Sequence, residues 1–234
     1  MDPMEKLAKT LALPRSELYY IDTDDAPLSM KITVTLRAKR VEKWIRTVQR
    51  NFLDAAAMKI VGLDCEFTDP RKPNQCAAVL QLSVAYETLV FQIVYDDDAP
   101  QVLKDFLADK NIYFCGAAIG NDVKMLSTYG IIIPSAIDLQ KILVNPTQNN
   151  PPGLYDLANH YLGTTLKKKK KDKNTPMTDE AKALIFGWGD VPLSRAQVTY
   201  AALDARVGFE LGRKHFNALG YNTHDDRLNL NIYE

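Results

Sequence analysis

The chain has 234 residues, and its 29 Lys plus Arg balance its 29 Asp plus Glu, so its net charge is zero. This length suffices for one domain with a sizeable core. Zero net charge argues against attachment to nucleic acid through overall charge, although a local basic groove remains compatible with it. No apolar run approaches the ~18 residues that a membrane span needs, so we expect no membrane association.

The cysteines and the first residues indicate the cellular compartment. Cys65, Cys76 and Cys115 are odd in number and form no CxxC pair. This pattern argues against a disulfide framework or a structural zinc and fits a reducing compartment. Residues 1–18 carry charges throughout and lack the apolar segment of a signal peptide. We therefore expect an intracellular protein of the nucleus, the cytoplasm or both.

Apolar periodicity predicts an alternation of strands and helices along the chain. Residues 31–36 alternate like a strand, and residues 37–52 carry apolar side chains at helical spacing. Further strands are predicted over 59–67, 78–85, 88–94, 111–115 and 131–137, and helices over 102–107, 122–129, 138–143 and 154–162. In the last helix, Ser194 and Gln197 form a capping box and Gly220 ends the element. This order predicts an α/β domain with a mixed sheet.

The domain organisation follows from the same elements. We expect an N-terminal segment over 1–30, one domain over 31–220 and a C-terminal tail over 221–234. A run of five lysines, Lys167 to Lys171, repels itself too strongly for a packed structure. It is interpreted first as a mobile surface loop, second as a nucleic-acid contact and third as a nuclear-import signal.

Two acidic residues occupy the end of an apolar strand. Asp64 and Glu66 are two residues apart, so a strand points both carboxylates to one face and Cys65 to the other. Two negative charges at the end of a buried strand repel each other and are costly to desolvate. A bound divalent cation relieves this repulsion. The alternative is a strand end that simply faces water.

Two further aspartates lie where helices begin. Asp122 follows a strand that ends in Gly-Ala-Ala-Ile-Gly-Asn, and Asp138 follows a short predicted strand. An aspartate in the first turn of a helix caps free backbone N–H groups and favours the positive end of the helix dipole. We interpret Asp138 as such a cap. For Asp122, a cap and a functional role are equally compatible with its position.

Tyr200 and Asp204 are four residues apart in the last helix and therefore share one of its faces. Their alanine and valine neighbours allow the helix backbone to pack closely against a sheet. A buried carboxylate without a partner is strongly unfavourable, which favours a functional role for Asp204. A salt bridge to Arg206 or Arg213 is the alternative, although Arg206 points to a different face.

These segments together resemble the DEDD superfamily of 3′→5′ exonucleases, in particular its tyrosine branch and the Werner syndrome exonuclease group. The family's first motif is met by residues 63–67 (LDCEF), and its second by residues 116–122 (GAAIGND). The third is met by Trp188, Pro192 and Gln197, with Tyr200 and Asp204 after them. The resemblance covers about residues 59–220. It implies a ribonuclease H-like fold: a five-stranded mixed sheet flanked by helices, with residues 31–52 as an N-terminal strand–helix extension.

The resemblance also implies a metal-dependent 3′→5′ exonuclease that releases nucleoside 5′-monophosphates from single-stranded DNA or RNA. Two Mg²⁺ or Mn²⁺ ions, roughly 3.5–4 Å apart, serve as cofactors in such sites. By analogy Asp64 bridges both ions, Glu66 and Asp204 complete the site of the ion that binds water, and Asp122 holds the second ion. Tyr200 orients the attacking water.

The substrate contacts and partners are less well defined by sequence. Phe67, Trp188 and the lysines Lys167, Lys168 and Lys169 are the candidates for substrate binding. Phe67 can equally be a core aromatic residue, and Trp188 can be structural. A homo-oligomer or a protein partner is also compatible with a lone domain. The alternative function is a nuclease-fold protein with weak catalysis that binds nucleic acid or self-associates as a scaffold.

Overall fold

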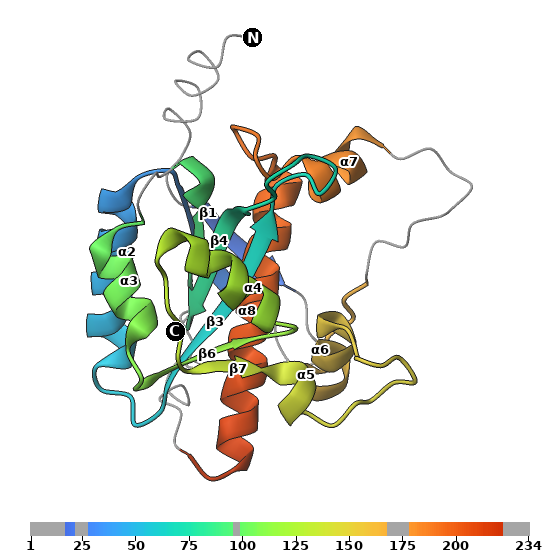
Figure 1. Ribbon diagram of the computed structural model, residues 1–234. Helices are drawn as coiled ribbons and strands as arrows, with labels where there is room; N and C mark the ends of the chain where they lie inside the picture. Colours follow the sequence, from blue (N-terminus) through green and yellow to red (C-terminus); the bar gives the residue numbers. More distant parts are fainter. Residues whose placement is uncertain (1–16, 22–27, 96–98, 168–177, 222–234) are drawn as a thin grey trace.

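A single mixed sheet forms the centre of the molecule (Figure 1). The computed structural model describes residues 17–21, 28–95, 99–167 and 178–221. Within these ranges seven strands lie in the order β1-β2-β5-β4-β3-β6-β7. Their bounds are Glu17–Ile21 (β1), Leu28–Thr35 (β2), Lys59–Phe67 (β3), Ala77–Val84 (β4), Glu87–Phe91 (β5), Ile112–Gly116 (β6) and Ala136–Asp138 (β7). The strand with the acidic pair, β3, is thus internal to the sheet.

The strand directions place the ends of several strands at one edge of the sheet. β3 is parallel to β6, and β6 to β7. β3 and β4 are antiparallel, as are β4 and β5, which form the predicted hairpin. β2 is parallel to β5, so it points the same way as β3. The predicted addition of a strand to the sheet by residues 31–36 is therefore confirmed.

One strand lies where none was predicted. β1 falls within the N-terminal segment 1–30 and pairs antiparallel with β2. Without it, β2 would present a row of unpaired backbone N–H and C=O groups. Sequence periodicity missed this strand because a five-residue edge strand is stabilised mainly by pairing with the adjacent strand, and its own residues show no clear pattern.

The helices surround this sheet. Their bounds are Ala38–Val48 (α2), Gln101–Ala108 (α3), Gly120–Leu126 (α4), Leu139–Ile142 (α5), Leu154–Leu162 (α6), Asp179–Phe186 (α7) and Arg195–Ala218 (α8). A π-helical turn, Gln49–Leu53, continues α2, and 3₁₀ turns lie at Ile93–Tyr95 and Ser127–Tyr129. The predicted capping box is confirmed, since Ser194 N–H donates to Gln197 Oε1 and Gln197 N–H to Ser194 Oγ. None of the helices in the described ranges has the length and hydrophobicity for crossing a membrane.

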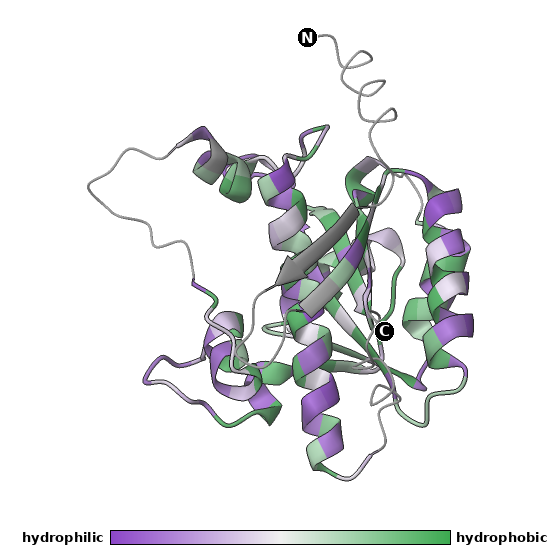
Figure 2. Cartoon of the chain, turned by 180° about the vertical axis from the view of Figure 1, so that it is seen from behind, coloured by the Kyte–Doolittle hydropathy of each residue, from purple (hydrophilic) through white to green (hydrophobic). Residues whose placement is uncertain are grey.

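Helices cover both faces of the sheet, as Figures 1 and 2 show from opposite sides. Leu89 and Phe91 of β5 belong to the apolar cluster that contains Val41 of α2. Val90, between them, packs in the cluster that contains Ala201 of α8. Because successive strand residues point to opposite faces, α2 and α8 lie on opposite sides of the sheet.

The long helix α8 approaches the central strands closely. A Cβ atom at Gly62 of β3 would lie 1.9 Å from the carbonyl oxygen of Ala205, and one at Gly208 would lie 2.8 Å from that of Cys115. Both contacts require glycine, since real Cβ atoms do not approach backbone oxygens so closely. The backbone of α8 therefore packs directly on the backbone of β3. This contact places the part of α8 around Ala205 beside the acidic end of β3.

Candidate active site

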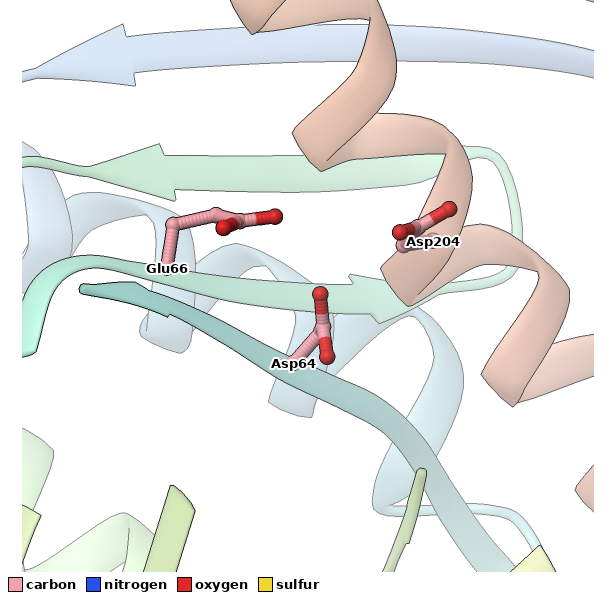
Figure 3. A group of neighbouring side chains, drawn as sticks. All are labelled: Asp64, Glu66 and Asp204. Carbon is pink, nitrogen blue, oxygen red and sulfur yellow. The ribbon is translucent and has the colours of Figure 1, made fainter. Parts of the chain in front are cut away.

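Three carboxylates from two elements converge at this contact. Asp64 and Glu66 extend from β3 and Asp204 from α8, and each offers an oxygen within 4.8 Å of the other two (Figure 3). Asp64 and Glu66 lie on the same side of the strand, as their spacing predicted. Asp204 is buried, and the other two are half-buried. Hard carboxylate oxygens at such distances can hold a divalent cation.

Burial and mutual repulsion raise the pKa values of these carboxyl groups. The pKa of Asp64 lies well above its usual value because of burial and then the charges of Asp204, Asp122 and Glu66. Burial, followed by Asp204 and Asp122, raises the pKa of Glu66 from 4.5 to about 9. The metal-free site therefore favours protonated carboxyl groups, and a cation would favour their ionised form.

Asp122 lies beside these three residues on another element. It occupies the first turn of α4, three residues after the N-cap residue Ile119, and it is 5% exposed. Burial and then the charge of Asp138 raise its pKa to about 8. Asp138 itself caps α5 as predicted, with its carboxylate accepting hydrogen bonds from the N–H groups of Gln140 (3.1 Å) and Ala118 (3.1 Å). Asp138 thereby also anchors the turn that leads into α4.

Tyr200 and Trp188 adjoin the acidic cluster. Tyr200 lies one turn before Asp204 and is 36% exposed, and its phenol lies close to the Asp204 carboxylate. The Trp188 ring packs 6.1 Å from the Tyr200 ring but is only 1% exposed, and its indole N–H donates to the Leu184 carbonyl. Its buried position suits a support for Tyr200 better than a surface for substrate.

The other predicted substrate contacts are placed as follows. Phe67 follows a register shift in the β3–β4 pairing, is half-buried and packs against the main core cluster. Lys167 is exposed, whereas Lys168 and Lys169 fall outside the described residues. Contact of these residues with substrate remains a prediction.

The structure adds a helix that sequence periodicity missed beside the site. α7 (Asp179–Phe186) is not among the helices that the sequence predicted. Its N-cap residue Thr178, followed by Asp179 and Glu180, is the signal that could have revealed it. Arg71 of the β3–β4 loop stacks 3.7 Å from the centre of the Phe186 ring, at the end of α7. This contact joins the loop after β3 to the segment before α8.

The structure also adds a second tyrosine, Tyr155 of α6. Its phenol lies close to the Asp204 carboxylate, and burial, followed by the charge of Asp204, raises its pKa. In the sequence Tyr155 precedes Asp204 by some fifty positions and carries no motif, so no local signal marks it.

The metal dependence of stability gives a first prediction. The pKa values of Glu66 and Asp122 in the folded protein lie above their usual values. The unfolded chain therefore releases these protons at a lower pH than the folded protein does. Their stabilising effect is complete below about pH 4.5 and is lost as the pH rises towards about 9. A cation offsets the repulsion that appears over this range.

We therefore expect the melting temperature in MgCl₂ to exceed that in EDTA by a margin that grows with pH. At a free cation concentration of about 100 times Kd, binding adds about 2.7 kcal/mol to the free energy of unfolding. Thermal unfolding at several pH values, with Glu66→Gln as a control, measures this margin. A margin that is constant or shrinks with rising pH contradicts the prediction.

Comparison with known proteins places this arrangement in a family. The sequence profile described as 3′–5′ exonuclease matches residues 45–217, which include all four acidic residues and Tyr200. The chain belongs to this 3′–5′ exonuclease family. The resemblance to DEDD exonucleases, seen in three motifs of the sequence, is thereby confirmed.

Curated relatives of this exonuclease domain are longer proteins. Exonuclease 3′-5′ domain-containing protein 2 of Mus musculus is 28% identical over 171 residues, which cover 69% of this chain and 24% of that protein. Bifunctional 3′-5′ exonuclease/ATP-dependent helicase WRN of Mus musculus is 29% identical over 160 residues, which cover 66% of this chain and 11% of that protein. The chain therefore spans no more than about a quarter of these relatives.

Solved structures share the fold of the exonuclease domain. The catalytic core of RRP6 from Trypanosoma brucei has a TM-score of 0.62 at 17% identity, covering 94% of this chain and 53% of that one. The Nibbler EXO domain of Aedes aegypti has a TM-score of 0.61 at 14% identity, with 91% and 98% covered. RNase D of Escherichia coli has a TM-score of 0.59 at 20% identity, with 86% and 48% covered. The predicted ribonuclease H-like fold is confirmed.

Proposed function

We propose that this domain hydrolyses phosphodiester bonds at the 3′ end of single-stranded nucleic acid and releases nucleoside 5′-monophosphates. The observation that carries the proposal is the convergence of Asp64, Glu66 and Asp204 within 4.8 Å, one helical turn from the partly exposed Tyr200. The family membership supplies the class of reaction. The zero net charge of this chain favours single strands over duplexes as the substrate.

The donor set suits divalent cations of the Mg²⁺ or Mn²⁺ type, and the proposed mechanism uses two of them. All four acidic side chains offer oxygen, which these hard cations prefer. The pKa values of Asp64 and Glu66 are raised by burial and then by repulsion from neighbouring carboxylates, and bound positive charge would relieve this repulsion. When bound, such cations neutralise charge on the phosphate and lower the pKa of water. Asp64, Glu66 and Asp204 would hold one cation, with Asp64 also reaching the second beside Asp122.

The protein's own groups then position the reactants. Tyr200 lies close to Asp204 and is partly exposed, so its hydroxyl can orient the attacking water against the terminal phosphate. Its pKa is raised by burial and then by Asp204, which keeps the phenol a neutral donor rather than a base. Trp188 packs beside it and limits the positions that the Tyr200 ring can take.

Tyr200→Phe gives a second prediction. Loss of the hydroxyl should lower kcat about 10²-fold, in the range typical of a positioned proton-handling group, with little change in cation affinity. Single-turnover hydrolysis at saturating MnCl₂ measures kcat, and calorimetric titration with MnCl₂ measures affinity. An unchanged kcat contradicts the role of Tyr200 in orienting water.

The proposed function is tested with 5′-labelled single strands of matched DNA and RNA sequence, with MgCl₂, MnCl₂ or EDTA at stated salt. We expect a ladder that shortens from the 3′ end, with mononucleotides as the other product, and no reaction in EDTA. The ratio of the DNA and RNA rates assigns the sugar preference. No release of mononucleotide with either cation contradicts the exonuclease proposal, and binding of the strand without cleavage would instead favour the scaffold alternative.

A further inference from the structure

Hydrogen bonds connect both ends of helix α6 to neighbouring helices. Asp156 accepts a hydrogen bond of 2.9 Å from the N–H of Gly153 and so fixes the first turn. Gln140 donates to the carbonyl of Pro152 at 2.7 Å, which ties the start of α6 to α5. At the other end, Lys214 of α8 donates to the carbonyl of Tyr161. Any side chain in the first turn of α6 is therefore held in a defined place relative to α8.

Tyr155 is the side chain that this arrangement directs at the acidic cluster. It is 9% exposed, and its phenol lies close to the carboxylates of Asp204 and Asp64. Tyr200, which contacts the same carboxylate, is 36% exposed. Tyr200 is thus the more exposed residue of the two, as expected of a side chain that contacts an incoming water or substrate.

We propose that Tyr155 is a positioning residue, whose hydroxyl holds the Asp204 carboxylate towards Asp64 and Glu66 and thereby sets the affinity of the cluster for a divalent cation. This inference rests on the proposed function of the cluster. A neutral phenol can donate one hydrogen bond to a carboxylate, and the remaining lone pairs of the carboxylate oxygens stay available to bind a cation. Partners of this kind orient a ligating carboxylate, and their loss weakens metal binding.

Tyr155→Phe keeps the buried ring and removes only the hydroxyl. We expect the dissociation constant for Mn²⁺, measured by calorimetry without nucleic acid, to rise about 10–100-fold. The rate of hydrolysis should fall at limiting MnCl₂ and recover at saturating MnCl₂, unlike that of Tyr200→Phe. Tyr161→Phe is the matched control, because Tyr161 lies on the same helix and its hydroxyl donates to the Val144 carbonyl at 3.0 Å.

The outcomes separate this inference from the proposed function. If the wild-type protein binds Mn²⁺ and Tyr155→Phe binds it equally well, the positioning role is overturned while the metal site stands. The role is also overturned if Tyr161→Phe weakens Mn²⁺ binding as much as Tyr155→Phe does. If the wild-type protein binds no Mn²⁺, both the inference and the metal site fail.

A different observation, on the opposite side of the sheet, carries a second inference. Lys39, Lys43, Arg46 and Arg50 are all exposed and line a shallow open groove along α2 and its π-helical extension. At about 100° per residue these positions fall within an arc of about 60°, so they form one column about 16 Å long. Polar residues alternate with the buried ones along this helix (Figure 2). The one acidic residue lining the groove is Glu42, which pairs with Arg46.

Like charges at successive turns of a helix repel one another, so this column lowers the stability of the helix. A surface that only has to be solvated does not need such a column. The backbone of a nucleic acid carries a regular row of negatively charged phosphates, which would neutralise the positive charges of the column. α2 begins just after β2, and β2 and β3 point the same way, so the Lys39 end of the column lies at the same end of the sheet as Glu66, three strands away from it. We infer that this column binds the phosphates of the substrate strand upstream of its 3′ end, an inference that also rests on the proposed function.

Strand length distinguishes this surface from the catalytic cluster. For Lys39→Glu/Lys43→Glu we expect KM to rise at least about 10-fold on strands of about thirty nucleotides, with KM and kcat unchanged on strands of about four. The dependence of log KM on log salt should flatten by about 1.4 for two lost contacts with a single strand. Lys59→Glu/Lys110→Glu, at the opposite edge of the sheet, changes the net charge equally and is the control.

Two outcomes would overturn the binding surface. One is an unchanged KM on long strands in the α2 variant, and the other is an equal rise in KM in the control variant. If the wild-type protein cleaves no strand of either length, the proposed function fails first and takes this inference with it.

Discussion

Asp64→Asn is expected to abolish exonuclease activity and, in EDTA, to make the protein more stable than the wild type. The substitution keeps the size of the side chain and removes one negative charge from a cluster whose oxygens lie within 4.8 Å. Bound cations contribute several kcal/mol to transition-state stabilisation, so we expect a loss of at least about 10³-fold in kcat/KM.

The gain in stability has the opposite cause. In the metal-free wild type, burial and the charges of three neighbouring carboxylates oppose ionisation of Asp64. Removal of this repulsion should raise the melting temperature in EDTA by about 2–4 °C for each kcal/mol gained. Addition of MgCl₂ should then stabilise the wild type much more than the variant, because the variant has lost a ligand.

Two controls make this result specific. Asp105→Asn removes a charge from the exposed face of α3, where substitutions typically change the free energy of unfolding by less than about 0.5 kcal/mol. Its activity and its response to MgCl₂ should match those of the wild type. Retained activity in Asp64→Asn would contradict the metal site, and a lower melting temperature in EDTA would contradict the repulsion.

Gly62→Ala is expected to reduce both stability and activity, although it adds one methyl group and changes no charge. Gly62 lies two residues before Asp64 on β3, and its added Cβ would lie 1.9 Å from the Ala205 carbonyl oxygen and 2.6 Å from the Phe209 backbone nitrogen. Because both atoms belong to the backbone of α8, the helix must move away from the strand. Overpacking of this kind costs about 1–3 kcal/mol.

The displaced helix also carries Asp204. A shift of about 1 Å in a catalytic group can lower activity about 10²-fold, so we expect a loss of that order. Thermal unfolding and the rate at saturating MnCl₂ measure the two effects. Gly120→Ala is the control, because its Cβ would meet no atom within 4 Å although Gly120 lies two residues from Asp122. Wild-type activity in Gly62→Ala would show that the close contact does not position Asp204.

Local sequence rules predicted many of the parts of this protein. The two-residue period of a strand put Asp64 and Glu66 on one face, and the four-residue spacing put Tyr200 and Asp204 on one side of α8. The capping box of Ser194 and Gln197 marked the start of that helix. These features depend on neighbours within one turn or one strand, so a linear chain displays them. The motifs they carry also identified the family.

Other features depend on residues that are distant along the chain. β1 exists through its pairing with β2, and α7 is held where Gln197 donates to the carbonyls of Ala183 and Gly187. Trp188 matched a family position, yet only packing decided that it is buried beneath Tyr200 rather than open to substrate. Periodicity cannot register contacts of this kind, because their partners are set by the fold.

The acidic cluster itself divides in the same way. The sequence alone determined which carboxylates share a face of one element, and family motifs proposed that they meet. Only the tertiary structure decided that Asp204 lies beside Asp64 and Glu66, because that contact depends on the bare backbone of Gly62 against α8. The structure likewise brought Tyr155 of α6 close to Asp204, since a contact between two helices has no period in the sequence.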